Sequence, residues 1–248
     1  MRVTVVGAGD AFSTGGAGQS CYRLDSGERA LALDFGATAL MGWKRSGWTS
    51  DELDAVAVSH LHGDHFGGLP FLLLDRQYVA ARIKPLALVG PPGFVERLSH
   101  LFEVLYPGHR LRAQWRFPLA MSEIAPGERI EVAGFALHAF EMAHASGAPS
   151  LGFRVEAGGK RVAYTGDSEW CDSHPALADG ADLFIVECNG GERAARGHLA
   201  WTTLAAEAGR LKARRIMATH LGAAAAARAN EMRAAGFDVA ADGLVVDA

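Results

Sequence analysis

The chain has 248 residues, of which 49% are hydrophobic and 21% are charged, a composition typical of a folded globular protein. Its formal net charge of −4 gives no overall attraction to nucleic acid or to an anionic membrane surface. We find no signal peptide and no apolar run long enough to span a membrane, and therefore expect a cytoplasmic protein. The three cysteines, Cys21, Cys171 and Cys188, are widely spaced and form no CxxC motif, which favours a reducing compartment.

The first half of the chain is predicted to form short strands, a glycine-rich loop and two helices. Strands are expected at residues 2–6, 20–25, 30–34 and 54–58. The loop from Gly7 to Gly18 lacks the third glycine of a GxGxxG motif and opens no helix pattern, which argues against a dinucleotide-binding fold. We expect this loop to lie close to the functional site. Apolar residues at helical spacing predict helices over 66–82 and 92–105.

The second half of the chain repeats this arrangement. We expect strands near residues 115–119, 129–132, 135–140, 151–156 and 160–165, then a strand at 182–187, a helix at 201–210, a strand at 214–219 and a helix at 223–235. In each half an antiparallel cluster precedes strands that alternate with helices. This order suggests two packed sheets with helices outside. No linker divides the chain, so we expect one domain over residues 1–248.

Three histidines and one aspartate fall within six positions, in the run His60-Leu61-His62-Gly63-Asp64-His65. The run follows a predicted strand, and α/β proteins bind ligands at the carboxyl ends of strands. Because residues i and i+2 of an extended chain point the same way, His60 and His62 can bind one ion. Gly63 allows a turn after which Asp64 and His65 can face a second ion. Imidazole and carboxylate groups suit zinc, and also iron or manganese.

Three more candidate ligands stand at the ends of later strands, namely His144, Asp167 and His220. If these strands converge on one edge of the fold, their side chains can join the histidine-rich run. The other histidines considered are expected to be packed or surface residues: His100, His109, His138 and His174.

The pattern His60-x-His62-x-Asp64-His65, followed by His144, Asp167 and His220, resembles the metallo-β-lactamase superfamily across essentially the whole chain. The resemblance implies an α/β (α+β) fold, the four-layer αββα sandwich. It also implies two divalent ions, Zn²⁺ or alternatively Mn²⁺ or Fe²⁺, with positions left for a bridging water or hydroxide. The ligands it implies are His60, His62 and His144 for one ion, Asp64, His65 and His220 for the other, and Asp167 as a bridge.

Two segments are similar to the ribonuclease Z branch and its phosphodiesterase relatives: Tyr164–Ser168, and Gly7–Phe12 after the first strand. Asp167 argues against antibiotic hydrolysis, because the best-known β-lactamases of this superfamily lack the bridging aspartate. The resemblance further implies catalytic roles for Glu187 and His198, a carboxylate that orients an imidazole near the scissile phosphate. An ordinary loop pair is the alternative.

The same resemblance gives Asp64 a second role, to orient or deprotonate the attacking water. Ribonuclease Z carries a long tRNA-binding arm between the counterparts of His144 and Asp167, but here these residues are only 23 positions apart. We therefore expect small or cyclic phosphodiesters as substrates rather than precursor tRNA. The basic segment from His109 to Arg112, with Arg116, is either a phosphate contact or a solvated loop.

Two other functions stay open from the sequence. The same ligand set serves thioester, lactone or lactam hydrolases, and some family members have become metal-binding proteins without activity. Relatives commonly dimerise, so a homodimer is also an expectation.

Overall fold

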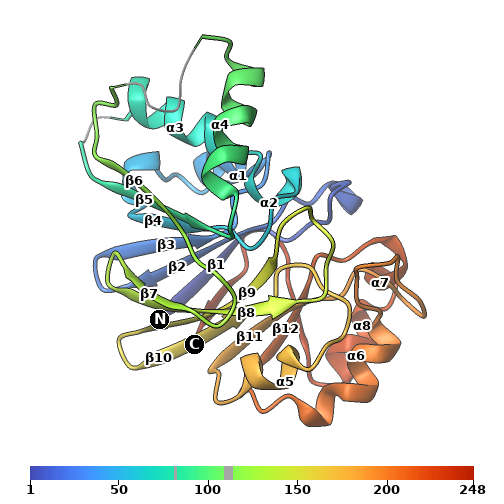
Figure 1. Cartoon of the computed structure of the whole chain (residues 1–248). Coiled ribbons are helices and arrows are strands. Elements are labelled where there is room, and N and C mark those ends of the chain that lie inside the picture. Colours follow the sequence, from blue (N-terminus) through green and yellow to red (C-terminus); the bar gives the residue numbers. More distant parts are fainter. Residues whose placement is uncertain (81–82, 109–113) are drawn as a thin grey trace.

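The computed structural model describes residues 1–80, 83–108 and 114–248. Within them, two seven-stranded mixed sheets pack face to face, and helices cover both outer faces, which gives four layers (Figure 1). The first sheet has the order β14 (Val245–Asp247), β1 (Arg2–Gly7), β2 (Cys21–Ser26), β3 (Arg29–Leu33), β4 (Ala55–Ala57), β5 (Leu86–Gly90), β6 (Leu119–Glu123). The second has the order β13 (Asp238–Val239), β12 (Ile216–Thr219), β11 (Leu183–Glu187), β10 (Lys160–Tyr164), β9 (Ser150–Ala157), β8 (Phe135–Met142), β7 (Arg129–Val132).

The helices fall into two groups by position along the chain, and each group lies outside its own sheet (Figure 1). Those outside the first sheet are α1 (Ala39–Arg45), α2 (Gly63–Phe66), α3 (Leu69–Tyr78) and α4 (Phe94–Leu105). Those outside the second are α5 (Ser173–Ala178), α6 (Trp201–Glu207), α7 (Ala223–Ala226) and α8 (Ala229–Ala234). None of the helices in the described ranges has the length and apolar character needed to cross a membrane.

Alternating side chains of both sheets form the central core. Val3 and Val5 of β1 meet Leu137 of β8 and Phe153 and Val155 of β9, and all five are fully or almost fully buried. Strands buried on this face place every second residue toward the other sheet. The packing of the two sheets therefore fixes where their strand ends lie.

The carboxyl ends of several strands reach the same edge of the sandwich. Strands β3 to β6 are parallel to one another, as are β10 to β13. Strand β8 runs antiparallel to β9, which runs antiparallel to β10, so β8 and β10 share a direction. The loops that follow β4, β8, β10, β11 and β12 carry the residues singled out in the sequence.

The structure corrects three expected elements. The strand expected at 115–119 is wrong, because Pro118 has no N–H to donate and pairing with β5 begins at Leu119. The helix expected over 66–82 is two short helices broken at Gly67 and Gly68. The backbone N–H of Gly68 donates to Phe35, and a Cβ there would collide with the Gly36 carbonyl at 2.2 Å.

The helix expected over 223–235 is likewise two helices, α7 and α8, which are interrupted at Ala227 and Arg228. Strand β5 and the helices α1 and α5 were not anticipated from the sequence. Residues 81–82, at the end of the expected 66–82 helix, lie outside the described ranges.

Candidate metal centre

The histidine-rich run leaves β4 as extended chain and then turns into α2. His62 has extended backbone angles, φ −86° and ψ 149°, and stands just before the helix. Asp64 and His65 fall in the first turn of α2, so they face a different direction from His60 and His62. The expected division of this run into two pairs is what the structure shows.

Four of the predicted residues converge in a first cluster, His60, His62, His144 and Asp167, whose potential ligand atoms all lie within 4.8 Å of one another. The Nε2 atom of His144 lies 3.1 Å from Nδ1 of His62. The Oδ2 atom of Asp167 lies 3.7 Å from Nε2 of His60 and 4.0 Å from Nε2 of His144. Three imidazoles and one carboxylate oxygen thus surround one point.

A second cluster contains Asp64, His65, Asp167 and His220, also within 4.8 Å. The Oδ2 atom of Asp64 lies 3.2 Å from Nε2 of His65 and 3.3 Å from Nε2 of His220. The Oδ1 atom of Asp167 lies 3.3 Å and 3.6 Å from the same two nitrogens. Asp167 therefore presents one oxygen to each cluster, the geometry of a bridging carboxylate.

The donor atoms of these clusters fit divalent metal ions. Nε2 of His60, Nε2 of His65 and Oδ1 of Asp167 are buried and have no hydrogen-bond partner among the described residues. Buried polar atoms without partners are rare in folded proteins and call for an ion or a water. Burial, with His65 nearby, lowers the pKa of His60 well below its usual value, which leaves its ring neutral, the form that binds a metal.

A buried aspartate that the sequence analysis missed orients several of these groups. Oδ2 of Asp34 accepts hydrogen bonds from Nδ1 of His65 at 2.7 Å, from the Ser59 hydroxyl at 2.8 Å and from the Tyr164 hydroxyl at 2.6 Å. The Ser59 hydroxyl also lies 3.0 Å from Nδ1 of His60. The position of Asp34 directly after β3 was the signal by which the sequence could have marked it as a candidate, since the other acidic candidates also follow strands.

Glu187 and His198 form the expected pair beside both clusters. Glu187 is fully buried, and its Oε1 accepts hydrogen bonds from Nδ1 of His198 at 2.8 Å and from the backbone of Ser168 at 3.0 Å. Its Oε2 accepts from the backbone of Asn189 at 3.0 Å. Because both oxygens are engaged, Glu187 is arranged to hold His198, although it also lies close enough to His220 to share an ion.

The ring of His198 reaches the centre of the site. It lies parallel to His220, with ring centroids 5.8 Å apart, and 5.0 Å from the ring of His144. Burial opposes the protonation of His198, but the hydrogen bond and charge of Glu187, with Asp167, outweigh it and raise its pKa. This imidazole therefore favours the protonated form and can donate a proton.

The glycine-rich loop supports the second cluster, as expected from the sequence. The carbonyl of Ala8 accepts a hydrogen bond from the backbone N–H of His220 at 3.0 Å. His220 adopts the left-handed conformation, φ 58°, which is uncommon outside glycine. Asp242 fixes the loop by accepting hydrogen bonds from the backbone of Ala8 at 2.9 Å and of Gly18 at 2.7 Å.

The remaining predictions fall outside the clusters. Within the ranges that the structure describes, His100, His138 and His174 belong to no group of potential metal ligands. The segment 109–112 lies outside the described residues, and the backbone N–H of Arg116 donates to the side chain of Gln77 in α3.

Comparison with known proteins identifies the family of the chain. Residues 36–221 match the family described as the β-lactamase superfamily domain. The chain belongs to this superfamily. It is 26% identical over 202 residues to ribonuclease Z of Mycobacterium bovis, and the match covers 75% of this chain and 69% of that protein.

Solved structures share the fold over nearly the full length. Human tRNase Z, short form, superposes with a TM-score of 0.80 at 23% identity and covers 100% of this chain and 99% of that one. A diphosphatase of the PhnP family gives a TM-score of 0.81 at 18% identity, covering 100% and 97%. The metallo-β-lactamase fold protein YhfI of Bacillus subtilis gives 0.81 at 23% identity, covering 99% of each chain. The predicted αββα sandwich is confirmed.

Proposed function

We propose that this protein is a dinuclear phosphodiesterase that acts on small or cyclic phosphodiesters. The observation that carries the proposal is the position of His198, which Glu187 holds through Nδ1 at 2.8 Å beside the carboxylate of Asp167, 3.8 Å away. An alkoxide leaving oxygen needs a proton as the phosphodiester is cleaved, and a cationic imidazole supplies one.

The two clusters would each hold one divalent ion, with Zn²⁺ first and Mn²⁺ or Fe²⁺ as alternatives. When bound, such a pair ionises water near neutral pH and stabilises negative charge on phosphate oxygens. The proposed ligands are His60, His62 and His144 in the first cluster, Asp64, His65 and His220 in the second, and one oxygen of Asp167 in each.

The chain's own residues would divide the proton transfers between them. Asp64 lies in the second cluster, where its carboxylate can orient the attacking water and accept its proton. Glu187 holds Nδ1 of His198, which leaves Nε2 as the nitrogen that donates to the leaving oxygen. Glu187 and His198 are thus proposed catalytic residues together with Asp64.

The chain between His144 and Asp167 supports a small substrate. Strands β9 and β10 fill this interval as a hairpin within the second sheet, and every residue of the interval is described. It therefore contains no protruding arm that could grip a tRNA, although the curated relatives carry the name ribonuclease Z. We infer that this protein differs from them in substrate size.

The test is a panel assayed side by side with metal-loaded protein: bis(p-nitrophenyl) phosphate, a 2′,3′-cyclic nucleotide, a thioester, a lactone and a lactam. We expect turnover of both phosphodiesters. His198→Ala should abolish most turnover of the 2′,3′-cyclic nucleotide, whose leaving group is an alkoxide, and His100→Ala, which changes an exposed histidine of α4, should not. Faster cleavage of an acyl substrate would replace this proposal with the acyl hydrolase alternative. Full metal content without any hydrolysis would indicate a binding protein.

A further inference from the structure

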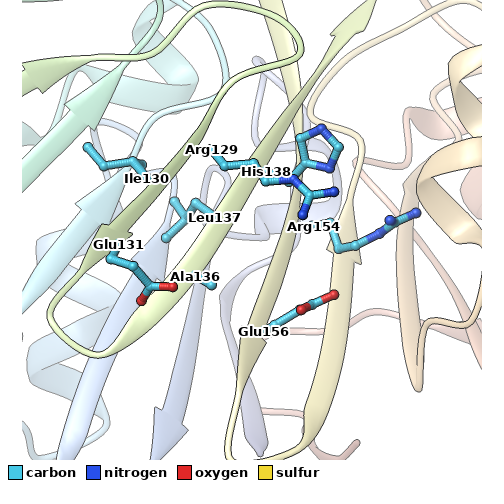
Figure 2. A pocket seen from close by; sticks show the side chains of 8 residues that line it. All are labelled: Arg129, Ile130, Glu131, Ala136, Leu137, His138, Arg154 and Glu156. Atoms are coloured by element: carbon cyan, nitrogen blue, oxygen red, sulfur yellow. The ribbon is translucent and has the colours of Figure 1, made fainter.

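A second feature lies on the outer face of the second sheet, at β7, β8 and β9. Leu137 and Val155 point into the core between the sheets, so their strand neighbours point outward. Among the outward residues are His138 of β8 and Arg154 of β9, and Arg129 of the edge strand β7 lies beside them (Figure 2). None of these three belongs to the metal clusters.

The strand register arranges the outward side chains in two rows. Arg129 pairs with His138, and His138 pairs with Arg154, so three nitrogen-rich side chains form one row. In the next row the small side chain of Ala136 stands between two glutamates, Glu131 and Glu156. All six residues border a cavity of about 320 Å³.

Within the described ranges, the arginines of this row form no close ion pair. Neither arginine has a carboxylate within ion-pair distance among the described residues, and Glu156 is engaged by Nε of Arg161 at 2.7 Å. Arg154 donates through Nη2 to the carbonyls of Ala176 and Leu177 at the end of α5.

Two nitrogen atoms of this row are also left without partners. Nε of Arg154 and Nδ1 of His138 are buried and have no hydrogen bond to any described residue. Burial and the two neighbouring arginines lower the pKa of His138. An anion placed between these side chains would offset the charges of the two arginines and accept a hydrogen bond from Nε of Arg154. It would also favour the protonated form of His138, whose Nδ1 could then donate to it.

We propose that this cavity binds a tetrahedral oxyanion, the phosphate group of a small phosphate ester, between Arg129, His138 and Arg154. Guanidinium groups match the oxygen atoms of phosphate in pairs, which favours this ligand over a spherical anion. The carboxylate of Glu131 borders the cavity, so the rest of the ligand carries no further negative charge. This site is separate from the metal centre and does not depend on the proposed hydrolysis.

The test follows the imidazole of His138 by proton NMR in the metal-loaded protein, with His138→Gln used to assign its signal. Sodium sulfate and then inorganic phosphate are titrated at constant ionic strength. Binding should raise the pKa of His138 in the wild type. Arg129→Gln should weaken the affinity about tenfold, as expected for the loss of a charged hydrogen-bond donor. Glu131→Gln should strengthen it, because it removes a negative charge from the cavity.

Arg215→Gln is the matched control, since Arg215 lies next to β12 and pairs with Asp238 instead. It should bind both anions like the wild type. Arg129→Lys keeps the charge without the paired donors and should fall between the wild type and Arg129→Gln. The proposal is overturned if neither anion changes the pKa of His138. Equal affinities in Arg129→Gln, Glu131→Gln and Arg215→Gln would also overturn it, because they would place the anion elsewhere.

Discussion

The Oδ2 atom of Asp34 lies 2.7 Å from Nδ1 of His65, and this contact leaves Nε2 as the ring nitrogen that faces the second cluster. The same oxygen accepts the hydroxyl of Tyr164 at 2.6 Å. Partners of this kind set the tautomer and the orientation of a metal-binding histidine.

Asp34→Asn should therefore weaken metal binding and lower activity, each by about 10- to 100-fold. Asparagine tolerates the left-handed backbone of residue 34, φ 58°, so the variant should stay folded. Competition with a chelating dye measures the affinity, and circular dichroism checks the fold. Tyr164→Phe, which removes one hydrogen bond and leaves His65 paired, should have a smaller effect. Equal losses in the two variants would contradict a role in orienting His65.

The two clusters should lose their ions separately. His144→Ala removes a ligand only from the first cluster and His220→Ala only from the second, so each should bind close to one ion per chain tightly. Asp167→Ala should weaken both sites, because its two oxygens face different clusters. Elemental analysis after dialysis gives the metal content. Two tightly bound ions in Asp167→Ala would show that this aspartate is not shared.

His198→Ala should slow turnover without reducing metal content. Loss of a general acid costs roughly 10²- to 10⁴-fold in kcat. The loss should be large for substrates with an alkoxide leaving group and small for p-nitrophenolate, which departs without a proton. Glu187→Gln should also lower kcat, again more for substrates with an alkoxide leaving group than for those that release p-nitrophenolate. A loss that is independent of the leaving group would assign His198 to binding.

Buried His174 should make the protein less stable in mild acid. Its ring is fully buried and stacks on Trp170, with centroids 4.7 Å apart, and burial lowers its pKa to about 4. The unfolded chain protonates this group near pH 6.5, so between about pH 6.5 and 4 it binds a proton that the folded chain does not. Stability is therefore lost as the pH falls through this window, by about 2 kcal/mol between pH 7 and 5.

Urea unfolding of the wild type and of His174→Gln, at pH 7 and at pH 5, isolates this contribution. The variant should be less stable at pH 7 but should lose about 2 kcal/mol less on acidification. Identical pH dependence in the two proteins would mean that His174 does not stay neutral in the folded state. Titration of the site residues is common to both proteins and cancels in the comparison.

The parts of the site that are close together in the sequence were the easiest to predict. The run from His60 to His65 is recognisable as a metal-binding motif, because a metal needs several donors and this run supplies four within six positions. Asp34 stands alone after its strand and contacts His65 across 31 positions, so its place in the sequence could mark it as a candidate but could not reveal its partner. Such pairings depend on which strands become neighbours.

The fold was predictable in its layers but less so in its element boundaries. The break between α2 and α3 depends on the close approach of Gly68 to Phe35, a tertiary contact that overrides the apolar spacing of the helix pattern. Likewise, β5 is an ordinary apolar stretch until β4 and β6 pair with both of its edges.

Each cluster draws residues from both halves of the chain, with His60 to His65 on one side and His144, Asp167 and His220 on the other. Neither half can therefore assemble either cluster by itself. During synthesis the complete set exists only after residue 220 has left the ribosome and the two sheets have docked. Ion loading should thus follow the last large step of folding, so that the amount of ion retained reports how many molecules have completed it.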